Sequence, residues 1–387
     1  MKGKRVLLIG WDAADWKVID QLIAKGQMPT LQRMIEKGVR GNLSTLQPVL
    51  SPMLWSSIAT GKYADKHGIH GFTEPDYEGG MVRPISSKSR TARAIWNILT
   101  QQGKKSNVFS WWPSNPAEPI NGIMVSNLYQ RASKPINQPW PMMDGTVHPA
   151  SLSDHFKKCR VHPDELSAAH ILPFIPKANE IEDKSKEKKI GALSKMIADA
   201  ATVHSASTWA LENTEWDFTA IYHDAVDHVC HGFMKYRAPQ LPGLPNEQFE
   251  LYKDVVDGIY RFHDMMLERT LEIVGPDTNV ILISDHGFQS DHLRPLKLPK
   301  EPAGPAAEHR QHGIICCYGP DFKEGQTIFG SSILDVTPTL LTLFGLPVGE
   351  DMDGTPLLQV FKETPEVKTI ESWENVEGKL GENEKNK

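Results

Sequence analysis

Three things are scarce in this chain of 387 residues: cysteine, long apolar runs and any excess of positive charge. Only four cysteines occur, and none has the spacing of a cysteine metal motif, so we expect free thiols in a reducing compartment. No stretch approaches the roughly 20 apolar residues that a membrane-spanning helix needs, so no membrane span is expected. The formal net charge of −6 argues against a nucleic-acid polymer as partner.

The first residues form a basic segment followed by an apolar run, which is how a secretory signal begins. The run Val6-Leu7-Leu8-Ile9 is short, however, whereas a signal needs ~7–15 apolar residues. We therefore expect a cytoplasmic protein. Hydrophobic content of 40% is ordinary for a folded domain, and nothing in the sequence indicates an oligomeric state.

Apolar runs alternate with helical patterns along the chain. The runs Val6–Ile9, Phe218–Tyr222 and Val280–Ile283 predict buried strands, because a strand covered on both faces is apolar throughout. The stretches 249–274 and 335–344 show helical periodicity. Strands that alternate with helices favour an α/β fold with a mostly parallel central sheet and helices on both faces.

Two segments differ from this pattern. Prolines are dense between residues 111 and 180, which predicts an irregular insertion lying over the active site. Residues 363–387 are polar and charged with few apolar anchors, so we expect a mobile tail. The remainder, residues 1–362, is predicted to form a single domain.

Side chains with oxygen and nitrogen ligand atoms follow several of the apolar runs. Asp12 follows the first run, and Asp285 and His286 follow a later one. Asp227 and His231 are four residues apart, so a helix would place them on one face. Open α/β sheets bind ligands at the carboxyl ends of their strands, which predicts that these residues share a site.

Each candidate also has a purely structural explanation. Asp12 could cap a helix, and Asp227 with His231 could begin an exposed one. His312 could be an ordinary loop histidine, and His309 could replace it as a ligand. The shared position of all these residues, just past strand-like runs, is what favours a metal site.

Several motifs agree in their order along the chain with one known family. They are Gly10-x-Asp12, Met28-Pro29-Thr30-Leu31, Pro48-x-x-Ser51, Thr60-Gly61, His67-Gly68-Ile69, Asp227-x3-His231, Asp285-His286-Gly287 and His312-Gly313. Together they resemble the alkaline phosphatase superfamily, and most closely its type I phosphodiesterase/nucleotide pyrophosphatase branch. The resemblance spans residues 5 to about 358 and implies an alkaline phosphatase-like core.

The resemblance also implies two divalent metal ions. One ion would be held by Asp227, His231 and His312, and the other by Asp12, Asp285 and His286, with Ser51 as a further ligand between them. Imidazole and carboxylate ligands suit Zn²⁺, and Mn²⁺ is a second option. Ser51 would act as the catalytic nucleophile and form a phosphoseryl intermediate, because a metal-bound hydroxyl is activated for attack.

The chain departs from the family at the position that binds the phosphate. Diesterase relatives often have an asparagine five residues after the first histidine of the His-Gly-Ile motif, where this chain has Phe72. Thr73, Arg294 or the backbone amides on the Ser51 side are the candidate replacements. The segment after Ser51 lacks the x-Pro-x-Arg pattern with which sulfatases mature a formylglycine, so a sulfatase is not expected.

The resulting hypothesis is a two-metal hydrolase of small-molecule phosphate esters. Diesters or pyrophosphates are favoured over monoesters, because a monoester carries an extra charge and Arg294 and Arg310 are the only arginines near the motifs. The alternatives are a phosphomonoesterase, or a phosphotransferase or mutase that returns the phosphoryl group to an alcohol. A silent metal-binding scaffold is a third reading, against which the complete set of ligand positions argues.

Overall fold

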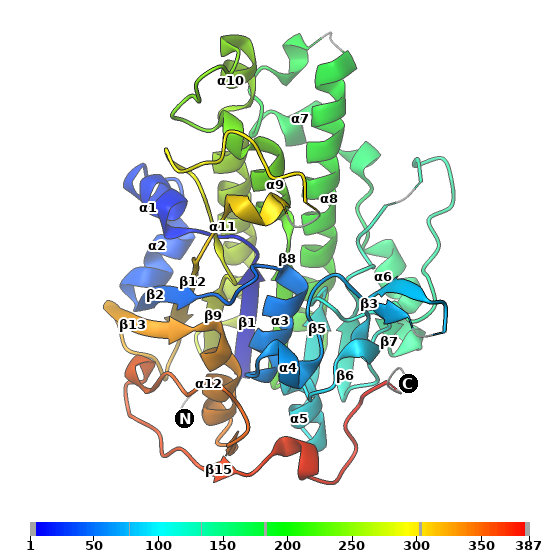
Figure 1. The fold of residues 1–387 in the computed structure, drawn as a ribbon, viewed down its shortest axis with the longest axis vertical. Coiled ribbons are helices and arrows are strands. Elements are labelled where there is room, and N and C mark those ends of the chain that lie inside the picture. The colour runs from blue at the N-terminus through cyan, green and yellow to red at the C-terminus, as the bar shows by residue number, and fades with distance from the viewer. Residues whose placement is uncertain (1–4, 77, 133, 182–183, 302–303, 384–387) are drawn as a thin grey trace.

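The computed structural model describes residues 5–76, 78–132, 134–181, 184–301 and 304–383. A nine-stranded sheet forms its centre, in the order β13-β2-β12-β9-β1-β8-β5-β6-β7 (Figure 1). In chain order these strands are β1 (Arg5–Trp11), β2 (Gly38–Ser44), β5 (Ser106–Phe109), β6 (Gly122–Val125), β7 (Val147–His148), β8 (Phe218–His223), β9 (Thr278–Ile283), β12 (His312–Tyr318) and β13 (Gln326–Ser332). Three two-stranded ribbons accompany it: β3 (Thr73–Asp76) with β4 (Met81–Pro84), β10 (Gly287–Phe288) with β11 (His309–Arg310), and β14 (Val348–Gly349) with β15 (Thr369–Ile370).

The sheet is mostly parallel, as predicted. Strands β9, β1, β8, β5 and β6 run in one direction, whereas β12 is antiparallel to both β9 and β2, and β7 is antiparallel to β6. The carboxyl ends of β1, β8 and β9 therefore meet at one edge. The amino end of β12 meets the same edge, because His312 pairs with Ser44 at the end of β2.

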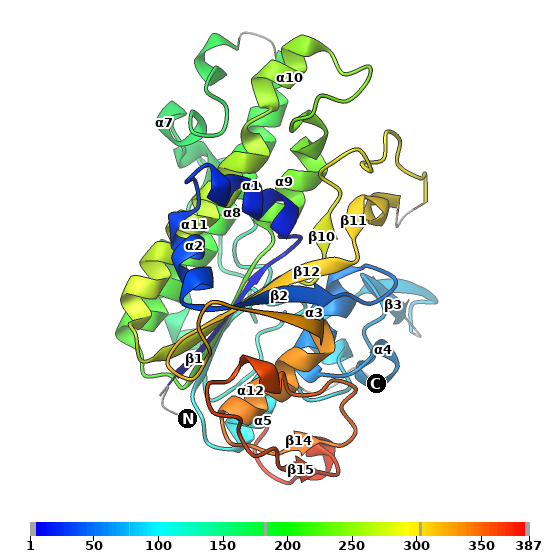
Figure 2. The ribbon, with the colours of Figure 1, turned by 90° about the vertical axis from the view of Figure 1, so that its left-hand side faces the viewer.

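Helices cover both faces of the sheet (Figure 2). They are α1 (Trp16–Ala24), α2 (Pro29–Glu36), α3 (Ser51–Thr60), α4 (Ala64–His67), α5 (Ile95–Gln101), α6 (Ser153–Lys158), α7 (Ala168–Ile171), α8 (Lys184–Asn213), α9 (Ala225–Phe233), α10 (Asn246–Tyr252), α11 (Val255–Val274) and α12 (Val336–Leu343). Short 3-10 helices are η1 (Ser87–Ser89), η2 (Ala150–Leu152), η3 (Pro163–Glu165), η4 (Ala178–Glu180), η5 (Met234–Tyr236), η6 (Gly304–Glu308), η7 (Ile333–Asp335), η8 (Leu358–Val360) and η9 (Trp373–Asn375). Within the described part of the chain, none of the helices combines the length and apolar character that crossing a bilayer requires.

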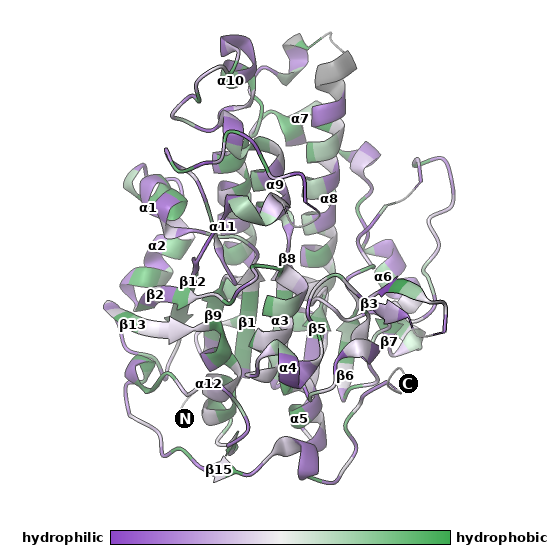
Figure 3. Ribbon diagram, viewed as in Figure 1, coloured by the Kyte–Doolittle hydropathy of each residue, from purple (hydrophilic) through white to green (hydrophobic). Residues whose placement is uncertain are grey.

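Alternation along the central strands separates two hydrophobic cores. On β1, Leu7 and Ile9 pack toward α1, α2, α8, α9 and α11, whereas Val6 and Leu8 pack toward α3, α5 and α12. Successive side chains of a strand point to opposite faces, so a strand between two helix layers must be apolar throughout. The hydrophobic colouring of the central strands in Figure 3 follows from this requirement.

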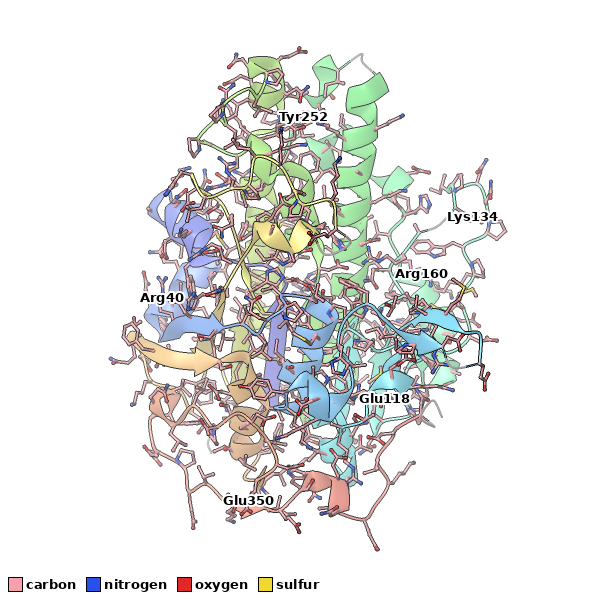
Figure 4. All side chains as sticks on the ribbon, in the orientation of Figure 1. Arg40, Glu118, Lys134, Arg160, Tyr252 and Glu350 are labelled. Atoms are coloured by element: carbon pink, nitrogen blue, oxygen red, sulfur yellow. The ribbon has the colours of Figure 1, made fainter. Side chains whose placement is uncertain are left out.

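The proline-rich segment 111–180 differs from the predicted irregular insertion. It supplies β6 and β7 to one end of the main sheet, because a short apolar run between its prolines is long enough to pair with β5. Buried Glu118, labelled in Figure 4, anchors the segment by accepting hydrogen bonds from Arg90 Nη2 at 2.9 Å and Trp96 Nε1 at 2.8 Å.

The tail also differs from the prediction, since residues 363–383 pack against the body of the protein. Strand β15 pairs with β14, and Thr369 donates a hydrogen bond to Glu350, labelled in Figure 4. The Trp373 side chain is buried, and its indole Nε1 donates to the Pro347 carbonyl at 2.9 Å. A buried tryptophan thus helps to hold this segment against the protein although most of its residues are polar. The last part of the predicted tail, 384–387, lies outside the described residues.

Candidate metal centre and active site

The candidate site lies at the sheet edge where β1, β8 and β9 end. Asp12 directly follows β1, and Asp285 and His286 follow β9. Asp227 and His231 lie on α9, the helix after β8, in its first and last turns. The sequence predicted that these five residues share a site, and the structure brings them together.

His309, rather than His312, completes the first group of ligand atoms. Its Nε2 lies 3.0 Å from His231 Nε2 and 3.4 Å from Asp227 Oδ1, while His231 Nε2 is 3.3 Å from the same oxygen. The antiparallel pairing of β10 with β11 places His309 opposite Phe288, close to the end of β9. Its ring stacks on that of His286 with centroids 3.9 Å apart.

The prediction for His312 is therefore wrong in the structure. Its side chain is exposed at the amino end of β12, and it takes no part in either group of converging ligand atoms. The glycine after His312 has a structural explanation, because the backbone at Gly313 lies very close to the backbone of Ser284. A Cβ atom there would lie 2.0 Å from the Ser284 carbonyl oxygen, so only glycine fits beside the segment that follows β9 and carries Asp285.

The second group contains Asp12, Asp227 and His286. Asp12 Oδ2 accepts hydrogen bonds from Tyr222 Oη at 2.6 Å and Trp55 Nε1 at 3.2 Å, which fixes the carboxylate. Its Oδ1 lies 3.2 Å from His286 Nε2 and accepts no hydrogen bond. One oxygen of Asp12 is thus held by the protein and the other is left for a ligand.

Buried polar atoms without partners gather around these two groups. Oδ1 of Asp12 and of Asp227, both carboxylate oxygens of Asp285, and His286 Nε2 have no hydrogen-bond partner. His286 Nδ1 lies 3.0 Å from the Gly287 carbonyl, which can only accept, so Nδ1 carries the proton and Nε2 is the free ligand atom. Buried polar atoms are normally satisfied, so this concentration requires an explanation.

The donor set fits divalent metal ions. Ligand atoms of a tetrahedral site with bonds of about 2.0–2.1 Å lie about 3.3–3.4 Å from one another. The three atoms contributed by Asp227, His231 and His309 are separated by 3.0–3.4 Å. Carboxylate oxygens and imidazole nitrogens are ligands that Zn²⁺ and Mn²⁺ accept.

The raised pKa values of two histidines in the cluster also indicate a site for a cation. Burial disfavours the charged imidazole of His231, but Asp227 and Glu308 outweigh it and raise the pKa to about 10. Burial likewise opposes the charge on His286, whereas Asp285 and Asp12 raise its pKa to about 10. Without a cation, protons on the histidines must balance the carboxylates.

Three further pKa shifts arise from burial and from neighbouring charged groups. Burial and the neighbouring Asp12 carboxylate raise the pKa of Asp285 well above its usual value. Burial and the nearby His286 lower the pKa of His309. Burial and Asp12 also raise the pKa of Tyr222 well above its ordinary value, so its hydroxyl stays protonated and donates to Asp12.

A pocket of about 240 Å³ opens onto both groups. It is lined by Asp12, Val49, Leu50, Ser51, Phe72, Trp112, Tyr222, Asp227, His228, His231, Pro305, Ala306 and His309. Ser51 is the first residue of α3, so the positive end of the helix dipole lies at its hydroxyl. Phe72 and Trp112 form an edge-to-face pair with centroids 5.3 Å apart.

The two residues predicted to bind phosphate do not line this pocket. Thr73 is exposed at the start of β3. Arg294 is buried and donates to the main-chain carbonyls of Met234, Arg237 and Pro239, so its guanidinium is already engaged. Among the described residues of segment 111–180, Trp112 alone lines the pocket, and η6 covers it instead.

The sequence left His309 open as a replacement for His312 but placed His312 in the ligand set, and it gave no role to Glu308. The only local signal was the presence of two histidines in one loop, and the choice between them depends on the pairing of β10 with β11.

A family model described as type I phosphodiesterase / nucleotide pyrophosphatase matches residues 6–296. No curated protein matches the chain by sequence. Human ectonucleotide pyrophosphatase / phosphodiesterase 5 is similar in structure at 12% identity and a TM-score of 0.53, covering 93% of this chain and 100% of that one.

Two other solved structures have similar folds. A putative sulfatase from Bacteroides thetaiotaomicron shares 13% identity at a TM-score of 0.57, covering 92% of this chain and 74% of that one. A variant of the alkaline phosphatase PafA shares 12% identity at a TM-score of 0.54, covering 93% of this chain and 99% of that one. At these identities the likeness concerns the fold.

Proposed function

The chain belongs to the type I phosphodiesterase / nucleotide pyrophosphatase family and is a phosphohydrolase, and from this premise we propose that it cleaves phosphodiester or pyrophosphate bonds with two divalent ions and Ser51 as nucleophile. The observation that carries the proposal is the cluster of unpartnered buried ligand atoms, of which those of Asp12 and Asp227 belong to residues that line one pocket together with Ser51. Such atoms are costly to bury unless a cation binds them.

The chain offers two sets of ligands for these ions. Asp227, His231 and His309 would hold one ion, and Asp12, Asp285 and His286 the other, with Zn²⁺ favoured and Mn²⁺ as the second option. Ions bound there would lower the pKa of the serine hydroxyl and neutralise charge on the phosphate oxygens. Tyr222 and Trp55 hold Asp12 in place for this role.

Ser51 carries the covalent chemistry in this proposal. Its hydroxyl loses its proton to solvent, Oγ forms a bond to phosphorus, the bond from phosphorus to the leaving oxygen breaks, and the leaving group departs with its electron pair. Water then attacks phosphorus, the bond from phosphorus to Oγ breaks, and Oγ takes a proton from solvent, so the net reaction is hydrolysis. The helix dipole at the start of α3 favours the negative charge that develops at this position.

The pocket lining supports a diester rather than a monoester as substrate. None of the described residues that line it is a lysine or an arginine. Phe72 and Trp112 instead provide an apolar wall, and Pro305 and Ala306 another part of it. A monoester dianion would lack cationic side chains to receive its additional charge, whereas a diester monoanion needs fewer.

A panel of substrates tests the proposal. Metal-stripped protein receives Zn²⁺, Mn²⁺ or Mg²⁺, and hydrolysis of p-nitrophenyl phosphate, a thymidine phosphate diester, a phenylphosphonate ester and a sulfate ester is compared. We expect metal-dependent cleavage, fastest with the diesters. Activity that is unchanged without metal, or restricted to the monoester, would contradict the proposal.

A further inference from the structure

Three consecutive residues before β12 reach three different parts of the site. Glu308 contacts His231 on α9, His309 lies among the ligand atoms, and Arg310 contacts Asp15 at the start of α1. We name Glu308, His309 and Arg310 the clamp. A residue between two anchored neighbours has little freedom, so the clamp restricts where the imidazole of His309 can lie.

Glu308 fixes the orientation and tautomer of His231. Its Oε2 accepts a hydrogen bond from His231 Nδ1 at 2.7 Å, and the carboxylate is largely shielded, with 16% of its side chain exposed. Because Nδ1 holds the proton, the lone pair of the neutral ring is on Nε2, which faces Asp227 and His309. A metal-binding histidine is commonly oriented by such a carboxylate.

Arg310 anchors the other side of the clamp. Its Nη1 donates to both carboxylate oxygens of Asp15, which also accepts hydrogen bonds from the main-chain N–H groups of Lys17 and Phe288. Asp15 thereby joins the first turn of α1 to both strands of the β10–β11 ribbon. Asp15 is three residues after Asp12, so the anchor lies close along the chain to the second group of ligand atoms.

We propose that Glu308 and Arg310 are positioning residues for the metal held by Asp227, His231 and His309, and that they act by orienting the two imidazoles. This inference rests on the proposed function. It adds that the affinity of this one metal depends on two side chains that touch neither the metal nor the substrate. Segment 304–310, whose Pro305 and Ala306 line the pocket, is held in place by the same contacts.

Metal affinity measured apart from activity tests the proposal. Zn²⁺ binding is titrated in competition with a chromophoric chelator for the wild type, Glu308→Gln, Glu308→Ala and Arg310→Gln. We expect Glu308→Ala to weaken one of two equivalents by about 10–100-fold and to leave the other unchanged. Glu308→Gln keeps an acceptor for Nδ1, so its loss should be smaller.

A spectroscopic signature separates orientation from general stability. Co²⁺ replaces Zn²⁺, and its visible absorption bands should change in shape in Glu308→Ala and Arg310→Gln, while the far-ultraviolet dichroism stays that of the wild type. Glu301→Gln changes an exposed carboxylate outside segment 304–310, is the matched control and should bind both metals normally.

The outcomes distinguish the two proposals. Wild-type protein that binds no Zn²⁺ or Co²⁺ would overturn the proposed function and this inference with it. Wild-type protein that binds two ions, together with a Glu308→Ala variant of the same affinity and the same cobalt spectrum, would overturn only the inference. If Glu308→Ala fails to fold, the same comparison is made with Glu308→Gln, for which unchanged affinity and spectrum would count against it.

Discussion

At the scale of the residue, replacing each of two serines on α3 tests whether Ser51 is the nucleophile. We expect Ser51→Ala to lower kcat by several orders of magnitude and to leave the metal content intact, because Ser51 is proposed as the nucleophile and three other ligands remain at each metal. Ser56 is the matched control, since its buried hydroxyl donates to the Pro52 carbonyl. Metal analysis and kcat are measured for both variants. A Ser51→Ala enzyme that keeps more than roughly a tenth of its activity would exclude this nucleophile.

A second pair of variants tests which histidine serves the site. We expect His309→Ala to lose one metal equivalent and to lower kcat/KM by about a hundredfold or more, about 2.7 kcal/mol in transition-state stabilisation. His312→Ala should resemble the wild type, because the His312 side chain is exposed outside the cluster. Elemental analysis and steady-state kinetics give the answer, and the reverse ranking would restore the interpretation drawn from the sequence.

These histidines also show which site residues the sequence can predict and which it cannot. Asp12, Asp285 and His286 follow strands that their apolar runs reveal, so a local pattern is enough to place them together. His309 reaches the cluster because β11 pairs with β10 across a long loop. Nothing local distinguishes it from His312, whose following glycine is required by backbone contact with Ser284.

Helix α2 shows how one element depends on another. Its N-cap residue, Met28, has no side-chain acceptor, and Asp264 of α11 accepts hydrogen bonds from the N–H groups of Thr30 and Leu31 at 3.1 and 2.8 Å. We expect Asp264→Ala to lower the free energy of unfolding by about 1–2 kcal/mol, the usual cost of losing a cap. Urea denaturation measures it.

The control for this prediction lies one turn further along α11. Glu268 pairs with Arg33 of α2 at 3.2 Å, but both side chains are about half exposed. A surface ion pair of this kind contributes about 0–1 kcal/mol, so Glu268→Ala should change stability less than Asp264→Ala. Equal losses for the two variants would show that Asp264 does not act as a cap.

At the scale of the element, the sequence predicts a strand well where burial of both faces makes the strand apolar throughout. The strands β1, β8 and β9 are apolar because both of their faces are covered, and the sequence reveals this directly. Strand β6 was missed because the prolines around it suggested irregular structure. The tail packs through Trp373 and Glu374, whose partners Pro347 and Arg93 lie elsewhere in the fold.

The whole molecule should lose stability in acid because of a buried histidine that is not among the candidate metal ligands. Burial lowers the pKa of His263 to about 4, and Trp11, His223, His204 and Asp224 surround it. The unfolded chain, with a histidine pKa of about 6.5, binds a proton first as the pH falls. Stability is therefore highest above pH 6.5 and falls below it, by about 2 kcal/mol between pH 7 and pH 5 from this group.

Denaturation of metal-stripped protein at both pH values checks this effect. The wild type is compared with His263→Gln, in which the other titrating groups are unchanged. We expect the variant to lose about 2 kcal/mol less than the wild type between pH 7 and pH 5. The same dependence on pH in both proteins would show that His263 does not contribute.

The central place of β1 has a consequence for the synthesis of the chain. Its Val6 pairs with Phe218 of β8 on one side and with Asn279 of β9 on the other. A ribosome adds ~5–20 residues per second, so the roughly 210 residues that separate β1 from its first partner take about 10–40 s to emerge. During that time this apolar strand lacks both of its partners in the sheet. A chaperone at the ribosomal exit therefore has a defined interval in which to prevent aggregation of the nascent chain.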